Sequence, residues 1–167
     1  MRYWLLKSEP SCFSIDDLQQ SPNQTTHWDG VRNYQARNYL RDQMQPGDAA
    51  FFYHSNCKTP GITGIVKIIS NAYPDYTAFD PNSEHPDLSS NPDNPRWFMV
   101  DVQFVEKFEN IISLAELKQH PELHQLALLK KGNRLSVSTI SEQAWNYIMS
   151  IFLLSHKGAE QDNEFHH

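Results

Sequence analysis

Short apolar runs, separated by turn residues, dominate the first half of the chain. Tyr3–Leu6 and Ala49–Tyr53 are continuously apolar, and a third run extends over Thr63–Ile69. Runs of this length are typical of strands that are buried on both faces. Apolar side chains at every second position of 98–104 predict a further strand with only one buried face. The run Leu135–Ser138 predicts a fifth strand.

Serines that can cap a helix mark three helix starts. Ser14 is followed by Asp17, and Ser113 by Glu116, each three residues on, which is the spacing of a capping box. Ser141 is placed to cap a last helix that runs to about residue 152. Helical spacing also begins at residue 33 and stops at the turn 46–48, and a second helical piece is expected over 123–129.

The order of these elements predicts the fold class. Strands and helices do not alternate in a βαβ rhythm and no segment repeats, so we expect a mixed α+β domain around a small curled sheet or barrel. His27–Gly30 is expected to be a loop. Residues 72–95 hold five of the ten prolines and show no periodicity, and a loop of that length is usually functional or mobile.

Composition limits the class of protein. The chain has 167 residues, 39% of them hydrophobic, which is enough for the core of one domain; we expect that domain to cover 1–155 and a polar tail to cover 156–167. No stretch has the roughly 20 apolar residues that a membrane helix needs. Cys12 and Cys57 are too few for a disulfide framework, which favours reduced thiols and a cytoplasmic location.

Charge argues against binding to nucleic acid by bulk attraction, because the formal net charge is −6. The excess of acids is local: residues 72–110 hold eight acidic and two basic side chains. The nearly neutral N-terminal part can therefore still present a local basic face.

Two kinds of chemistry find little support in the residue spacing. Metal-binding patterns such as Cys-x-x-Cys and His-Glu-x-x-His are absent, so neither a metal nor another cofactor is expected. Cys57, His54 and Ser55 share one loop, but adjacency in sequence does not make a catalytic triad, and no catalytic residue is assigned.

Large aromatic rings next to polar side chains indicate a pocket for a flat ligand. A planar heterocycle binds between aromatic faces, and hydrogen bonds at its edge supply identity. Trp4 and Trp145 lie inside apolar runs and are assigned to the core, whereas for Trp28 and Trp97 core and pocket are equally plausible. The candidate pocket residues are Ser8, Trp28, Arg32, Asn33, Tyr53, His54, Ser55, Trp97 and Ser136.

Seven stretches of the chain resemble the EVE domain family, and together they are highly specific. They follow one another from residue 3 to about residue 152, nearly the whole chain. The stretches are Tyr3–Pro10, Trp28–Asn38, Tyr53–Ser55, Gly61–Ile65, Tyr73–Asp75, Pro95–Trp97 and Arg134–Val137.

The resemblance implies a PUA-like fold, a small curved mixed β-barrel flanked by short helices, and kinship with YTH and ASCH domains. YTH domains hold N6-methyladenine in a cage of aromatic rings, and EVE domains are associated with modified bases in DNA. Where a YTH domain carries a cage tryptophan and a serine, this chain has Arg32 and Asn33. The aromatic wall must then come from Trp28, Tyr53 or Trp97, and N6-methyladenine is not the expected ligand.

Residues and resemblance together predict a non-enzymatic, monomeric module that binds nucleic acid carrying a modified base. Modified cytosine in DNA is favoured over RNA, and no membrane partner is expected. The base is expected to be flipped out of a duplex, or presented by a single strand, and inserted between Trp28 and either Trp97 or Tyr53. Phosphate contacts are expected from Lys7, Arg32 and Arg134.

Two other classes of function remain open at this stage. An ASCH-like hydrolase or amidohydrolase acting on modified nucleosides would need Glu9 or His54 as its acid or base. A protein-interaction module would use the acidic loop 72–95 instead.

Overall fold

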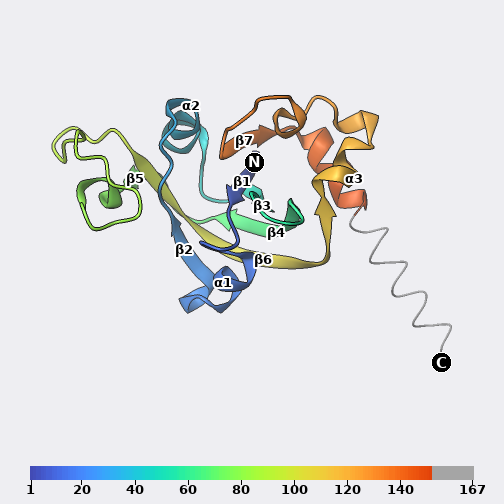
Figure 1. Ribbon diagram of the computed structural model, residues 1–167, viewed down its shortest axis with the longest axis horizontal. Helices are drawn as coiled ribbons and strands as arrows, with labels where there is room; N and C mark the ends of the chain where they lie inside the picture. The colour runs from blue at the N-terminus through green and yellow to red at the C-terminus, as the bar shows by residue number, and fades with distance from the viewer. Residues whose placement is uncertain (152–167) are drawn as a thin grey trace.

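A computed structural model describes residues 1–151 of the chain. The expected tail 156–167, the expected domain end at residue 155 and the expected helix end near residue 152 lie outside the described residues. Within them the chain forms one mixed sheet with short helices packed on both faces (Figure 1). None of the described helices has the length and apolar character needed to cross a membrane.

Six strands form the sheet in the order β2-β6-β4-β3-β1-β7, and a short β5 pairs with β6. β1 and β3 are parallel, and the other pairs are antiparallel. The strands are β1 (Tyr3–Ser8), β2 (Thr25–Trp28), β3 (Ala49–His54), β4 (Gly61–Ile68), β5 (Tyr73–Pro74), β6 (Phe98–Ser113) and β7 (Val137–Ile140).

β6 gives the sheet its curvature. This strand has 16 residues and shifts its register against β4 at two places. It bends around the other strands (Figure 1). The backbones of β4 and β6 approach so closely that a Cβ atom at Gly64 would overlap the carbonyl oxygen of Glu106. The prediction of a mixed α+β domain on a small curved sheet is confirmed.

The central strands bury both of their faces, which explains why their sequences are continuously apolar. On one face, Trp4 and Phe52 join a core that includes α1 (Ile15–Gln20) and α2 (Tyr34–Asn38). On the other face, Phe51 joins a core that includes α3 (Leu114–Lys118) and the last helix, residues 142–151. Trp145 stacks on Phe51 there, with 3.9 Å between ring centroids, so Trp4 and Trp145 are core residues as predicted.

The three predicted caps are confirmed. The Ser14 and Ser113 side chains accept hydrogen bonds from the N–H groups of the residues three positions on, and Ser14 completes a capping box with Asp17. The Ser141 hydroxyl accepts the Ala144 N–H in the same way. Each cap satisfies an N–H that the first turn of a helix leaves unpaired.

Several elements differ from the predictions. Residues 27–28, expected in a loop, end β2, because an edge strand of four residues is too short to show a period. The helix from residue 33 is regular only to residue 38 and continues as a π-helical turn over Tyr39–Gln43. The piece expected over 123–129 is two separate 3-10 turns, Pro121–Leu123 and Ala127–Leu129.

Asp48 fixes the start of the sheet from a buried position. Only 4% of its surface is exposed, and its carboxylate accepts three hydrogen bonds of 3.0 Å, from Trp4 Nε1 and from the Arg2 and Gln45 N–H groups. The carboxylate therefore joins the first residues of β1 to the turn before β3.

We expect Asp48→Ala to lower the free energy of unfolding in urea by about 3 kcal/mol, because three donors lose their acceptor and burial denies them water. Asp42→Ala is the matched control, since Asp42 is exposed and bonds only to its neighbour Arg41; its unfolding curve should stay close to wild type. Equal unfolding midpoints for the two variants would show that Asp48 does not hold this corner.

Candidate functional site

A pocket of about 430 Å³ opens where β1 and β2 end side by side. We call it the β1 pocket. Its volume lies within the range of small-ligand sites. Its walls come from β1 and the turn after it, from β2 and the turn after it, from loop residues 84–85 and from the residue before β7. The lining residues are Lys7, Ser8, Glu9, Cys12, Phe13, Thr26, His27, Trp28, Asp29, Gly30, Val31, Glu84, His85 and Ser136.

Aromatic rings form much of the wall. Trp28 is only 7% exposed and meets the Phe52 ring edge-on, with 5.4 Å between centroids. Phe13 also packs toward Phe52, at 6.5 Å. The rings of Phe13 and Trp28 are therefore held by the core, while His27 and His85 line the pocket from the more exposed side.

Polar groups are distributed around the same pocket. The Ser8 hydroxyl donates to the Phe13 carbonyl at 2.6 Å, which leaves its oxygen able to accept. Burial lowers the pKa of the Lys7 ammonium. Loss of hydration, followed by the negative charge of Asp75, raises the pKa of the Asp29 carboxyl. The pocket thus offers hydroxyls and a carboxylate to the edge of a planar ligand, whereas the Lys7 ammonium lies 5.9 Å from the centre of the Tyr53 ring.

Gly30 allows the loop 72–95 to close over the turn after β2. Its φ is +77°, a conformation that side chains disfavour, and a Cβ atom there would lie 2.6 Å from the His85 ring. The imidazole therefore packs directly on the glycine backbone at the pocket wall.

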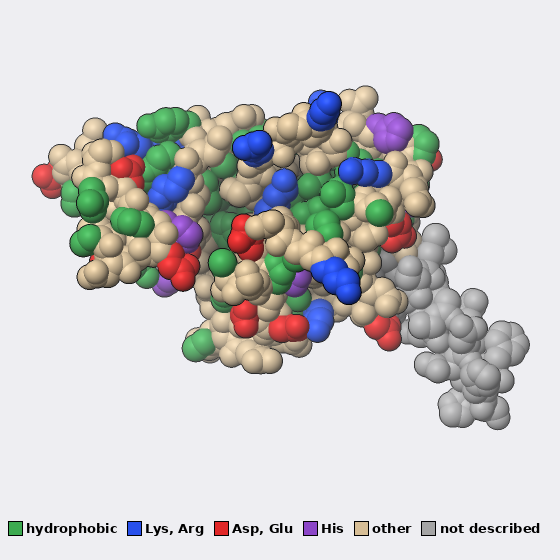
Figure 2. Space-filling model, viewed as in Figure 1, with side chains coloured by type: hydrophobic (Ala, Val, Ile, Leu, Met, Phe, Trp, Pro, Cys, Tyr) green, Lys and Arg blue, Asp and Glu red, His purple; other side chains and the backbone are tan. Residues whose placement is uncertain are grey.

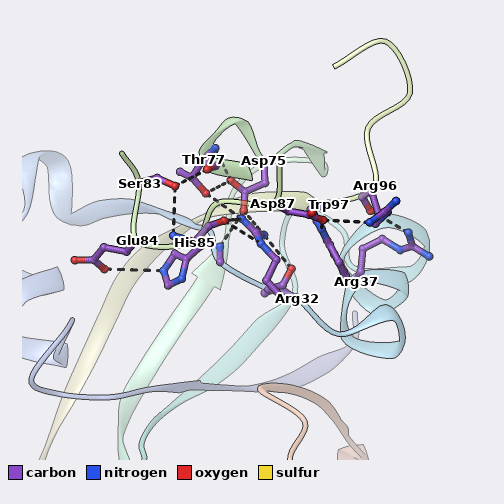
Figure 3. A network of polar contacts seen from close by, with 12 residues as sticks. Arg32, Arg37, Asp75, Thr77, Ser83, Glu84, His85, Asp87, Arg96 and Trp97 are labelled. Carbon is purple, nitrogen blue, oxygen red and sulfur yellow. Dashed lines mark hydrogen bonds and ion pairs between the residues drawn. The ribbon is translucent and has the colours of Figure 1, made fainter. Parts of the chain in front are cut away.

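A buried carboxylate ties that loop down (Figure 3). Asp75 has no exposed side-chain surface, and its carboxylate accepts from the Gly30 N–H at 2.9 Å, from Arg32 Nη1 at 2.9 Å and from Thr77. Burial alone would raise the pKa of Asp75, but the hydrogen bonds from Thr77, Gly30 and Arg32 lower it. The carboxylate stays ionised inside the protein.

Arg32 is fully engaged within the protein, in contrast to the phosphate contact predicted for it. Its guanidinium makes five hydrogen bonds: Nε and Nη2 to the His85 carbonyl, Nη1 to the Val31 carbonyl and to Asp75, and Nη2 to Thr77. A guanidinium has five N–H donors, so none remains for an external ligand. These hydrogen bonds hold the loop against the turn 30–33. Arg32 itself does not line the β1 pocket.

Trp97 does not face the β1 pocket either. It is 6% exposed, stacks on Tyr34 with 5.1 Å between centroids, and donates from Nε1 to Asp87 at 2.6 Å (Figure 3). The Arg32 guanidinium lies 5.6 Å from its ring on the way to Asp75. The expected sandwich of one ligand between Trp28 and Trp97 is therefore not assembled by this structure.

The other predicted pocket residues support the site from outside. Tyr53 is 2% exposed and lies in the same core as Phe51, where burial raises the pKa of its hydroxyl to about 12. His54 accepts the Ile15 N–H at 3.1 Å, and burial lowers its pKa. The Ser55 N–H donates to the Ser8 carbonyl, and Asn33 caps α2. Ser8, Trp28 and Ser136, together with Lys7, are the predicted residues that line the pocket.

Ten of the fourteen lining residues were not among the predicted ones, and Phe13, His27, Asp29 and His85 are ring-bearing or charged examples. His27 has a recognisable environment only in three dimensions, because its Nδ1 lies 2.9 Å from both Asp101 and the Tyr73 hydroxyl on neighbouring strands. Asp29 is the one that the sequence could have indicated, because it directly follows Trp28, which was already a candidate pocket residue.

On the face that Figure 2 shows, most Lys and Arg side chains lie in the upper half. There they lie over α2 and the loop that leads to β7, and most Asp and Glu side chains lie lower on this face. Arg134, a predicted phosphate contact, is exposed just before β7.

Among the described residues, no three His, Cys, Asp or Glu side chains are grouped to hold a metal ion.

A curved mixed sheet with a pocket of rings and polar groups at one strand end defines a small ligand-binding domain of PUA-like class. The EVE domain family matches residues 2–151, and the chain belongs to that family. Human thymocyte nuclear protein 1 is 48% identical over 165 residues, which cover 89% of this chain and 73% of the human protein.

Solved structures agree with this assignment. Human THYN1, crystallised in complex with 5-methylcytosine-containing DNA, is 47% identical with a TM-score of 0.87, covering 91% of this chain and 98% of that one. A protein from Pseudomonas syringae is 49% identical with a TM-score of 0.86, covering 90% and 99%. An ASCH protein from Zymomonas mobilis shares the fold alone, at 8% identity and a TM-score of 0.53, covering 90% and 98%.

The comparisons contradict the prediction of a cytoplasmic location. That prediction rested on two cysteines and on the lack of an apolar segment, which do not separate one reducing compartment from another. The animal relatives, 47–50% identical, carry the name of a nuclear protein.

We expect Arg32→Gln to lower the free energy of unfolding by about 3 kcal/mol, because it leaves the buried Asp75 without its cation. Acid unfolding should also begin at a higher pH. The lowered pKa of Asp75 supplies stability that is present above the ordinary Asp pKa and is lost as the pH falls through the folded value. Arg2→Gln, which changes the same charge at an exposed residue, is the control. Wild-type stability together with a weaker salt dependence of nucleic-acid binding would instead make Arg32 a phosphate contact.

Proposed function

We propose that this domain is a non-enzymatic DNA-binding module that accepts one modified cytosine in the β1 pocket. The observation that carries the proposal is the pocket itself, walled by Trp28 and Phe13, in a chain 47% identical to a protein crystallised with 5-methylcytosine-containing DNA. The base is flipped out of the duplex, because a base that stays stacked between its neighbours cannot enter a pocket.

The pocket matches the polar edge of cytosine. The Asp29 carboxylate accepts a hydrogen bond from the exocyclic amino group, which is the usual pairing of an acidic side chain with this base. Ser136 donates to its ring nitrogen or carbonyl oxygen, and the Ser8 oxygen, whose proton is bonded to Phe13, accepts from the amino group as well. Trp28, Phe13 and Val31 supply the apolar surface, against which the ring and its 5-substituent lie.

The energy balance limits the affinity. Stacking on an aromatic side chain contributes about 1–3 kcal/mol per base, while flipping costs a few kcal/mol. These terms nearly cancel, so net affinity depends on contacts to the phosphates and falls with salt. Lys7 at the pocket and the exposed Arg134 are proposed contacts; Arg32 is not, because its donors are all engaged.

Binding without catalysis is supported by how the two candidate acid–base residues are used. His54 lies outside the β1 pocket and accepts a backbone N–H, a role that needs its neutral ring. Glu9 lines the pocket, and its Oε1 accepts from Asn56 at 3.2 Å. Incubation with 5-methylcytidine and related nucleosides should yield no released base or deaminated product, and any product formed would favour the hydrolase alternative.

We expect wild-type protein to prefer 5-methylcytosine over cytosine in otherwise identical DNA by about fourfold. Burying one methyl group contributes about 0.8 kcal/mol, which corresponds to that factor. Fluorescence anisotropy with a duplex and with a single strand measures the preference and shows whether flipping limits it. Equal affinity for modified and unmodified DNA in both forms would refute the proposed function.

We expect Asp29→Asn to reduce affinity for either DNA about tenfold, because the charged carboxylate acceptor is replaced by a neutral amide that also presents donors. Wild-type binding should weaken as the pH falls toward the raised pKa of Asp29, and the variant should lack this dependence. A raised pKa means that ionisation of Asp29 destabilises the fold above that pKa, so the variant should melt at a higher temperature at neutral pH. Asp80→Asn makes the same charge change outside the pocket and should alter neither binding nor its pH dependence.

A further inference from the structure

A second hollow, of about 470 Å³, lies between α2 and the end of the loop 72–95. Three arginines line it: Arg37 and Arg41 from α2 and the turn after it, and Arg96 from the loop. We call it the arginine hollow. Like charges gathered in one hollow repel one another, so their convergence favours an anionic ligand.

The arginines are held in place by the protein. Arg37 donates from Nε to Asn38 at 3.0 Å and from Nη1 to the Arg96 carbonyl at 2.9 Å. Arg96 donates from Nη1 to Asp87 at 3.2 Å and to the Ser89 hydroxyl at 3.0 Å. Within residues 1–151 the Nη2 groups of Arg37 and Arg96 have no hydrogen-bond partner, so both forks keep donors for a ligand.

The acids next to the hollow neutralise only part of this charge. Asp42 pairs with Arg41 at 2.7 Å, and Asp87 pairs with Arg96. Arg37 has no carboxylate partner in the described part of the chain, which leaves a net positive charge among these five side chains. One lining residue is Ser90, whose hydroxyl oxygen is the single buried side-chain nitrogen or oxygen atom of the described residues that has no hydrogen-bond partner.

The arginine hollow and the β1 pocket are built on the same two segments. Val31 lines the pocket and Tyr34 lines the hollow, and three residues span at most about 10 Å. Likewise His85 lines the pocket and Ser89 the hollow. Phosphates follow one another along a DNA strand about every 3.4 Å of helix rise, so both sites lie within a few nucleotides of one strand.

From these observations we infer that the arginine hollow binds a phosphodiester group of the strand whose flipped base occupies the β1 pocket. The inference rests on the proposed function and supplies the phosphate contact that Arg32 cannot make. Planar guanidinium groups match the paired oxygens of a phosphate, and a serine hydroxyl is a common further donor. The hollow provides affinity and register, and the pocket provides the identity of the base.

The test compares the salt dependence of DNA binding for Arg37→Gln, Arg41→Gln and wild type. Loss of one phosphate contact should weaken binding to methylated and unmethylated duplexes by the same factor, roughly tenfold at low salt. The slope of log K against log salt should fall by about 0.9. Lys118→Gln, an exposed charge on α3, should leave the slope unchanged. Arg41→Gln guards against misfolding, because the Arg41 side chain bonds only within α2 and the turn after it.

Unchanged slopes in both hollow variants, with melting temperatures like wild type, would overturn the inference. So would a loss of methyl preference in Arg37→Gln, which would place its effect in the β1 pocket. If wild-type protein shows no preference for 5-methylcytosine but the hollow variants still lower the slope of log K against log salt, the proposed function is refuted and the phosphate contact is not. Saturation of the hollow by inorganic phosphate in 31P NMR, with unchanged DNA slopes, would identify a free anion as its ligand and overturn the inference too.

Discussion

The Asp75 carboxylate is the constraint on which the site depends. A fully buried charge is unfavourable unless donors surround it, and here Gly30, Thr77 and Arg32 do so. Those donors come from the turn after β2 and from the loop 72–95 itself. Pairing them converts a segment rich in proline, with no periodicity of its own, into a fixed wall of the β1 pocket. The pairing of β5 with β6 holds only the first residues of the loop to the sheet, and the Asp75 contacts join the loop to the turn after β2.

A continuous stack carries this order from the pocket to the basic surface. The Arg32 guanidinium lies over Trp97, Trp97 stacks on Tyr34, and the Arg37 guanidinium lies 4.9 Å from the Tyr34 ring. Each guanidinium is attracted to the ring that it covers, and the two rings between them stack on each other. Trp97 therefore contributes by setting the distance between two sites rather than by contacting a ligand. A rigid spacing matters because binding at both sites is favourable only when one strand can reach them together.

The sequence was informative where one residue determines its own environment. Caps at Ser14, Ser113 and Ser141 and the doubly buried strands β1 and β3 were predictable, because local hydrogen bonds and two-sided burial leave a pattern in the sequence. The role of Trp97 was not predictable, because a tryptophan beside polar residues gives the same sequence pattern whether it lines a pocket or stacks on another ring. The hydrogen bonds of Arg32 were not predictable for a related reason: Asp75 and His85, two of its acceptors, are more than 40 residues away in the sequence. Lining residues such as Phe13 and His85 meet only after the loop has closed.

Net charge is a poor guide to this chain's affinity for DNA because many of its acids are internal acceptors. Asp87 accepts from Ser89 and Trp97, bonds that lower its pKa to about 2. Asp101, despite the opposing effect of burial, has its pKa lowered by His27 and Tyr73. With Asp75, these are three of the eight acids that give residues 72–110 their negative charge. Each is matched by donors within the fold, and charges beyond about 8 Å are screened at physiological salt. What a phosphate senses is therefore the local surplus of basic side chains, and three arginines supply one where α2 faces the loop.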